Sequence, residues 1–281
     1  MKSIAEQVEE VYRAVAQDYD RLITPCRVGQ FAALLAELRL EGRERALDVG
    51  CGTGGLTLML ARSLPRGEVI GVDLCTEVLE IARRKAEAAG LGNASFRRGD
   101  ALSLSFVDES FDLVVSSFLL PWVPNPDRAL GEIARVLKRS GKLGLITAGS
   151  RFYDAFYRAL EGLIRRYPRH YGKISAEELI GAQRFAGKEL QEKLERLGFS
   201  VRCRFQLSLE DPLTPEQYLR RINALTAELY LKPLPPQRRE EARRSLLSGL
   251  EELGQDRDGE LLAVECSLIL VGIKKGGGER K

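Results

Sequence analysis

The chain has 281 residues, which is long enough for one large α/β domain with additional helices or for two small domains. Its 43 basic and 40 acidic residues leave a net charge of +3, without the strong basic excess typical of nucleic-acid-binding proteins. We therefore expect no nucleic-acid partner. Apolar residues make up 44% of the chain, but no apolar run approaches the roughly 18 residues of a membrane span, so we expect no membrane partner either.

The N-terminal segment predicts two helices. Apolar residues recur at helical spacing over residues 3–20 and again over residues 29–40, and Pro25 lies in the loop between them. The first stretch, "MKSIAEQVEEVY", is charged and lacks the apolar region of a secretory signal, so we expect a cytoplasmic protein. Five cysteines without CxxC spacing are typical of free thiols in a reducing compartment and do not indicate a metal site.

Strands and helices alternate between residues 44 and 150. The first strand, "RALDV", runs into a glycine-rich loop and a helix, and the second, "EVIGVD", is followed by a helix that ends at Gly90. "ASFRRGD" and "FDLVVSSF" are the third and fourth strands. The next helix carries Lys138 and Arg139 in its last turn, and "KLGLITAG" is the fifth strand. This alternation predicts a parallel sheet with helices on both faces and ligands at the carboxyl ends of the strands.

The pattern changes after Gly149. An amphipathic helix with aromatic residues, "FYDAFYRALEGLIRRY", comes first, and a second helix then leads into the strand "SVRCRFQLSL". Residues 215–254 form a helical insertion with Pro233, Pro235 and Pro236, and "LLAVECSLILVGI" is a final strand. We expect the helical regions 151–185 and 213–255 to be lids near the ligand.

The loop after the first strand fits two ligand-binding patterns. Gly50, Gly52 and Gly55 match the G-x-G-x-x-G loop of dinucleotide-binding proteins. Read from Asp48, the same segment matches D-x-G-x-G-x-G, with Gly54 as the last glycine. A carboxylate beside the loop disfavours a diphosphate and favours a ligand with positive charge. S-adenosylmethionine meets this requirement, because it carries an ammonium and a sulfonium group and no phosphate.

Two further acids follow the second and third strands. Asp73 can accept hydrogen bonds from both hydroxyls of a ribose, which suits NAD and S-adenosylmethionine equally. Asp100, within "GDAL", can accept a hydrogen bond from the amino group of an adenine. The strand ends therefore predict a nucleoside ligand.

With these motifs in order, residues 44–148 resemble the class I S-adenosylmethionine-dependent methyltransferases, in the small-molecule (methyltransferase type 11) branch. The resemblance rests on "ALDVGCGTGGL", "VIGVDLCTEVLEIARRKA" and the segment from "FRRGDAL" to "GKLGLIT". It implies a Rossmann-like, doubly wound α/β fold with a mostly parallel seven-stranded sheet, an antiparallel last strand and helical lid insertions. S-adenosylmethionine is the implied cofactor.

The resemblance also implies a division of the chain and a set of cofactor contacts. Residues 1–43 would cover the cofactor, residues 44–150 would form the core that binds it, and residues 151–281 would complete the sheet and carry the lids. The implied cofactor-binding residues are Tyr19, Asp48, Gly50, Gly52, Gly54, Asp73, Leu74, Asp100, Ala101, Ser116 and Ser117.

The acceptor is less defined. No N/D-P-P-Y-type motif follows the fourth strand, where the sequence reads "SSFLLPWV", and this argues against amino groups of bases or of glutamine as acceptors. The following run resembles the branch that methylates small molecules and carboxylates, so we expect O-methylation of an anionic or polar metabolite by a monomer or homodimer. Alternatives are C- or N-methylation of a small molecule, a non-catalytic S-adenosylmethionine-binding protein, and a dehydrogenase.

Several residues are candidates for the acceptor pocket, each with a simpler structural explanation. Phe118, Trp122 and Tyr153 could line it or belong to the ordinary core. Arg166 and Arg169 could bind an anion or lie at a solvated helix end. His170, the single histidine, is the candidate catalytic base, although an ordinary surface histidine is the simpler explanation.

Overall fold

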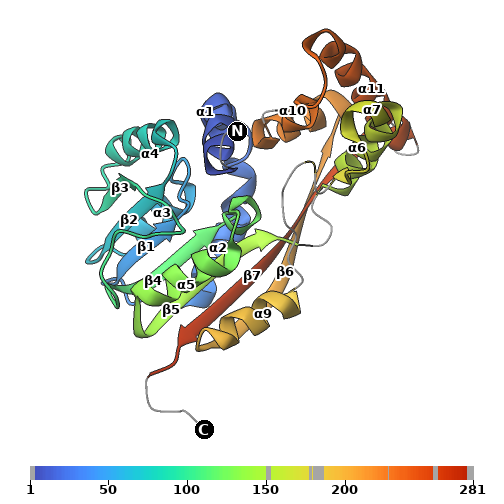
Figure 1. Ribbon diagram of the computed structural model, residues 1–281. Coiled ribbons are helices and arrows are strands. Elements are labelled where there is room, and N and C mark those ends of the chain that lie inside the picture. The colour runs from blue at the N-terminus through green and yellow to red at the C-terminus, as the bar shows by residue number, and fades with distance from the viewer. Residues whose placement is uncertain are drawn as a thin grey trace.

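A seven-stranded sheet forms the centre of the computed structural model, which describes residues 4–149, 153–176, 179, 187–226, 228–255 and 259–276 (Figure 1). The strand order is β3-β2-β1-β4-β5-β7-β6. The strands are β1 (Arg45–Val49), β2 (Glu68–Asp73), β3 (Ala94–Arg98), β4 (Phe111–Ser117), β5 (Leu137–Ala148), β6 (Phe199–Leu213) and β7 (Leu261–Lys274). Strands β1 to β5 are parallel, and β7 runs antiparallel to both β5 and β6. The predicted mostly parallel sheet with an antiparallel last strand is confirmed.

Helices cover both faces of this sheet, because its central strands are apolar on both sides. One face carries α2 (Val28–Leu38), α3 (Gly55–Ser63) and α4 (Thr76–Ala88), and the other carries α5 (Pro126–Val136) and α9 (Gly187–Arg196). Leu47 of β1 packs in the α5 and α9 layer, whereas its neighbour Ala46 packs in the α2 and α3 layer. Adjacent residues of one strand therefore enter opposite cores.

Helix α5 ends earlier than its sequence pattern predicts. The helix ends at Val136, and Lys138 and Arg139 belong to strand β5. Leu137 is fully buried and pairs with Phe111 of β4, beside a register shift in that pairing. Burial of Leu137 on the sheet outweighs the helical pattern of the residues around it.

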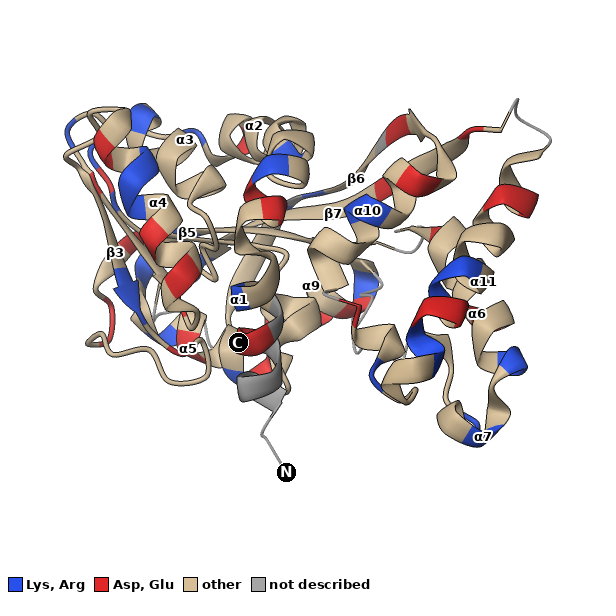
Figure 2. Ribbon diagram, turned by 90° about the horizontal axis from the view of Figure 1, so that it is seen from above, with Lys and Arg blue, Asp and Glu red and all other residues tan. Residues whose placement is uncertain are grey.

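A helical lobe lies at the far end of β6 and β7 (Figures 1 and 2). Strand β5 pairs with β7 only as far as Ser267, whereas β6 continues along β7 to Leu261. The resulting two-stranded extension carries α6 (Asp154–Arg166), α7 (Pro168–Tyr171), α10 (Pro215–Thr226) and α11 (Pro236–Gly254). Their apolar faces share one aromatic-rich core, which includes Phe156, Tyr218 and Tyr230.

The N-terminal helix α1 (Ile4–Leu22) lies between the sheet and this lobe (Figure 1). It contacts α4 on one side and α10 on the other. A short 3₁₀ helix, η1 (Pro25–Arg27), joins it to α2. In the part of the chain that the structure describes, no helix is both long and apolar enough to cross a bilayer.

Candidate functional site

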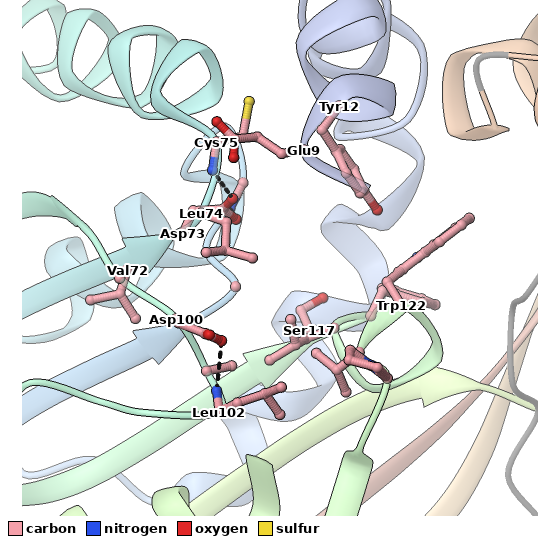
Figure 3. A pocket seen from close by; sticks show the side chains of 18 of the residues that line it. Glu9, Tyr12, Val72, Asp73, Leu74, Cys75, Asp100, Leu102, Ser117 and Trp122 are labelled. Carbon is pink, nitrogen blue, oxygen red and sulfur yellow. Dashed lines mark hydrogen bonds between the residues drawn. The ribbon is translucent and has the colours of Figure 1, made fainter. Parts of the chain in front are cut away.

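A cavity opens where β1, β2, β3 and β4 end, below helix α1 (Figure 3). About 810 Å³ of empty space lies within it, a volume that includes open solvent. Its lining residues are Glu9, Tyr12, Tyr19, Gly50, Gly52, Val72, Asp73, Leu74, Cys75, Gly99, Asp100, Ala101, Leu102, Ser117, Phe118, Leu119, Trp122, Val123 and Pro124. The carboxyl ends of parallel strands therefore build the site, as the alternation of strands and helices predicted.

The glycine-rich loop forms one wall of the cavity. Gly50 has φ +74°, and a Cβ at this position would lie 2.8 Å from the Leu119 side chain. The Gly50 N–H donates to the Val72 carbonyl at 2.8 Å, which ties the loop to the neighbouring strand. Gly54, at the start of helix α3, has φ +80°. It packs against Ala82 of helix α4 and lies away from the cavity. Glycine at position 50 is thus required by both the backbone and the available space.

Asp73 lies at the end of β2 and holds the loop in place. Its Oδ2 accepts a hydrogen bond from the Gly52 N–H at 2.9 Å, and its Oδ1 accepts one from the Cys75 N–H at 3.0 Å. Burial raises the pKa of Asp73, and these backbone hydrogen bonds only partly offset the rise. Each carboxylate oxygen keeps a lone pair, so Asp73 can still accept two hydroxyl groups from a ligand in the cavity.

Asp100 and the two residues after it form the opposite end of the cavity. Asp100 Oδ1 accepts a hydrogen bond from the Leu102 N–H at 2.8 Å, which closes a tight turn (Figure 3). Ala101 and Leu102 add apolar surface to the lining. A flat heterocycle with a polar edge would fit this combination.

Asp48 lies below the loop and does not line the cavity. Only 1% of its surface is exposed, and its Oδ2 accepts a hydrogen bond from the Thr57 hydroxyl at 2.6 Å. Burial raises its pKa to about 7, despite that hydrogen bond. Its other oxygen has no hydrogen-bond partner among the described residues. The sequence pattern predicted a charged Asp48 facing the ligand. In the fold, Asp48 lies beneath the glycine loop and does not reach the cavity.

The two serines at the end of β4 point in different directions. The Ser116 hydroxyl donates to the Val49 carbonyl at 2.8 Å, and the residue is buried between strands. Ser117 lines the cavity (Figure 3). Alternation along a strand separates neighbours in this way, so adjacent serines do not share the site.

Aromatic side chains form the wall nearest to helix α1 and the helical lobe. Tyr12 makes edge-to-face contacts with Tyr19, at 5.7 Å between ring centroids, and with Trp122, at 6.0 Å. The Glu9 carboxylate lies beside Asp73 and Cys75 (Figure 3). The sequence analysis named neither Glu9 nor Tyr12. Tyr12 lies two helical turns before Tyr19, and this spacing was the available signal that both face the same way.

Four of the predicted acceptor-side residues lie away from the cavity. Tyr153 is buried and donates a hydrogen bond to Glu265. Arg166 pairs with Glu241 at 3.3 Å in a groove between α6 and α11. Arg169 and His170 are exposed on the short helix α7, where the His170 ring contacts that of Tyr167. Of the proposed acceptor residues, Phe118 and Trp122 line the cavity.

Comparisons with known proteins agree with the architecture. A family model described as a methyltransferase domain matches residues 46–141. The chain is 33% identical to a demethylmenaquinone methyltransferase of Staphylococcus aureus over 217 residues, which are 72% of this chain and 89% of that protein. It is 30% identical to the enzyme of the same name from Lactobacillus johnsonii over 208 residues, 69% of this chain and 85% of that one.

Solved structures show the same fold. YcgJ of Bacillus subtilis has a TM-score of 0.62 and 20% identity, and the match covers 89% of this chain and 99% of that one. Phosphoethanolamine N-methyltransferase 2 of Haemonchus contortus, solved with S-adenosyl-L-methionine, has a TM-score of 0.60 and 18% identity, with 98% of this chain and 61% of that one covered. Together with the sequence relatives, they confirm the resemblance stated above and S-adenosylmethionine as the cofactor.

Proposed function

This chain belongs to the class I S-adenosylmethionine-dependent methyltransferases, and we propose that it methylates a flat, largely apolar acceptor such as a hydroxylated aromatic ring. The observation that carries this proposal is the composition of the cavity wall beyond the cofactor loops. Tyr12, Tyr19, Phe118 and Trp122 supply aromatic surface there, and none of the described lining residues is Lys or Arg. A planar apolar molecule gains from such a wall, whereas a carboxylate finds no cation to pair with.

The cofactor fits the residues at the strand ends. Asp73 retains two free acceptor positions for ribose hydroxyls, and the turn from Asp100 to Leu102 suits an adenine. The backbone of Gly50 and Gly52 can approach the methionine portion closely, because neither glycine has a side chain that would project into the space. When bound, the cofactor supplies an activated methyl group on a positively charged sulfur.

The protein's own contribution is to bind, orient and exclude water. The Tyr12, Tyr19 and Trp122 rings hold an acceptor against the methionine end of the loop, with its nucleophilic atom in line with the bond that breaks. Helix α1 covers the cavity and keeps water from the transfer. A hydroxyl acceptor loses its proton in the course of the transfer, and because His170 lies outside the cavity lining, the group that takes this proton is not His170.

The curated relatives named demethylmenaquinone methyltransferases support this acceptor class, because their named substrate is a naphthoquinone. The sequence prediction of O-methylation of an anionic metabolite is the second candidate. This candidate uses Arg166 and Arg169 to bind the acceptor. Both residues lie on the outer face of the lobe, so they would have to move to reach the cavity. We place it second for that reason.

Turnover with defined acceptors tests the proposal. The purified protein is incubated with S-adenosylmethionine and either dithionite-reduced demethylmenaquinone or a panel of small carboxylates, and methylated products are measured by mass spectrometry. We expect methylation of the aromatic acceptor and a higher KM for it in Trp122→Leu. Phe106→Leu, which removes an aromatic ring that does not line the cavity, is the matched control. Methyl esters as the sole products would overturn the aromatic acceptor.

A further inference from the structure

A single buried arginine touches two residues of the cavity wall from behind. Arg27 of η1 is 3% exposed, and its Nη1 donates to the Tyr19 hydroxyl oxygen at 2.6 Å. Its guanidinium carbon lies 3.7 Å from the centroid of the Phe118 ring. Tyr19 and Phe118 line the cavity, whereas Arg27 does not.

Arg27 keeps its charge through a buried partner. Glu265 of β7 is 2% exposed, and its Oε2 lies 3.9 Å from Arg27 Nε. The Tyr153 hydroxyl donates to the other oxygen of Glu265. Burial lowers the pKa of Arg27, but the neighbouring Tyr19 and Glu265 more than offset this, so the pKa is raised and the guanidinium stays charged. A buried cation of this kind is costly to desolvate, and hydrophobic packing would stabilise the fold at least as well.

Phe118 needs an external constraint. Its φ is +55°, which is unusual for a bulky residue, and it directly follows the end of strand β4. The backbone N–H of Phe118 donates to the Ile146 carbonyl at 2.7 Å, which fixes the chain, and the stack on Arg27 fixes the ring. Strained backbone of this kind is found where a structure must hold a side chain in one orientation.

The contacts continue from Tyr19 to the opposite side of the aromatic wall. The Tyr19 ring contacts Tyr12, and Tyr12 contacts Trp122. Arg27 thus lies at the buried end of a continuous series of contacts that ends at the single tryptophan of the chain. The cofactor-side residues Asp73 and Asp100 are not part of this series.

We propose that Arg27 is a positioning residue for methyl transfer, which fixes Tyr19 by a hydrogen bond and Phe118 by a cation–π stack so that the acceptor-side wall has one geometry. The Glu265 carboxylate, held by Tyr153, provides the counter-charge that makes a buried guanidinium tolerable. This inference rests on the proposed function, because it assumes that the aromatic wall receives the acceptor. Loss of Arg27 should therefore impair turnover more than cofactor binding.

The test removes both charges together, because Arg27→Met alone would leave Glu265 buried without a counter-charge. The double variant Arg27→Met/Glu265→Gln is compared with Arg243→Met/Glu228→Gln, which removes a partly buried ion pair of the helical lobe that lies away from the cavity lining. Arg27→Lys is the conservative variant, which keeps the charge without the planar guanidinium. Circular dichroism verifies that each variant is folded.

Two measurements are made on each variant. The first is acrylamide quenching of Trp122 fluorescence with S-adenosylhomocysteine bound, which needs no acceptor. The second is kcat and KM with reduced demethylmenaquinone, together with the Kd of S-adenosylhomocysteine from calorimetry. We expect increased quenching and a kcat lower by roughly 10- to 100-fold in the Arg27/Glu265 variant, in line with the cost of misplacing reacting groups. The Kd should change less than about threefold, and Arg27→Lys should lie between wild type and the double variant.

The outcomes separate this inference from the proposed function. If wild-type protein does not methylate the quinol, the acceptor proposal fails, and the quenching measurement alone still decides the role of Arg27. Unchanged quenching in the Arg27/Glu265 variant overturns the positioning role, whatever the acceptor is. An equal loss in the Arg243/Glu228 control also overturns it, because the effect would then be one of general stability.

Discussion

Replacing Asp48 by Asn should make the stability of the apo-protein less dependent on pH. Asp48 is buried below the glycine loop, and burial raises its pKa from an ordinary 3.8 to about 7. A folded-state pKa above the unfolded value means that the group stabilises the fold below pH 4 and that this contribution is lost as the pH rises to about 7. Asparagine has the shape of the protonated acid and cannot ionise, so the variant lacks this loss.

The size of the effect follows from the difference between the two pKa values. A difference of about three pH units corresponds to about 4 kcal/mol over the whole range, at 1.36 kcal/mol per unit. Between pH 5 and pH 8, where the protein is easier to study, the expected part is about 2.5 kcal/mol. Asp48→Asn should therefore gain about this much in free energy of unfolding, relative to wild type, between the two pH values.

Urea unfolding of both proteins at pH 5, 6, 7 and 8, without cofactor, measures this difference. Asp112→Asn is the control, because both the folded and the unfolded pKa of Asp112 lie below pH 5, so this substitution should change the free energy of unfolding by the same amount at all four pH values. Burial of Asp112 raises its pKa, but hydrogen bonds from Lys138 and from the Arg45 N–H outweigh it, so the pKa is lowered. Parallel curves for wild type and Asp48→Asn would refute the reasoning and show that Asp48 ionises normally in the folded protein.

Three further predictions concern the site. Asp73→Ala should weaken S-adenosylmethionine binding at least about tenfold by calorimetry. It should also lower the melting temperature, because the Gly52 and Cys75 N–H groups lose their acceptor. An unchanged Kd would show that the ribose binds elsewhere. His170→Ala should reduce kcat less than about tenfold, because His170 is exposed and away from the cavity lining, and a loss near the 10⁴-fold upper range of general-base catalysis would show that it is the base. Helix α1 should exchange its amide hydrogens more slowly when S-adenosylhomocysteine is bound, whereas β1 and β4 should not change; equal exchange in α1 would show that it does not close over the cofactor.

The sheet and the cofactor side of the cavity could be predicted from the sequence because they depend on local patterns. The strands β1, β2 and β4 are short apolar runs, and the carboxyl ends of parallel strands must meet at one edge of the sheet. Asp73 and Asp100 needed no further information to be placed at this edge. Asp48 lies two residues before Gly50, the first glycine of the loop, and the face it takes depends on Thr57 of helix α3, which the strand pattern does not show.

The acceptor side could not be predicted in the same way, because it is assembled from segments far apart in the chain. Arg27 and Glu265 meet in the interior, although nothing in either local sequence indicates the other. Arg166 is the last residue of an aromatic helix that was expected to be a lid, and His170 follows it, but the extension of β6 and β7 holds this helix away from the cavity. The amphipathic pattern shows that the helix has a buried face, and it does not show which neighbour covers that face.

The two sides of the cavity also differ in how they are held. The glycine loop is fixed by buried backbone hydrogen bonds to β2, such as that of Gly50 to Val72. Helix α1 is held over the cavity by apolar packing, such as that of Ala16 with Val78 of α4, and by side-chain ion pairs such as Arg13 with Glu77 at 2.6 Å. The exposed Arg13–Glu77 pair contributes little and is screened by salt, so the buried contacts, including the hydrogen bond from Arg27 to Tyr19, supply most of the stability of this arrangement. Because Tyr12 and Tyr19 belong to α1, the packing of this helix also determines where the acceptor-side wall stands relative to the cofactor loops.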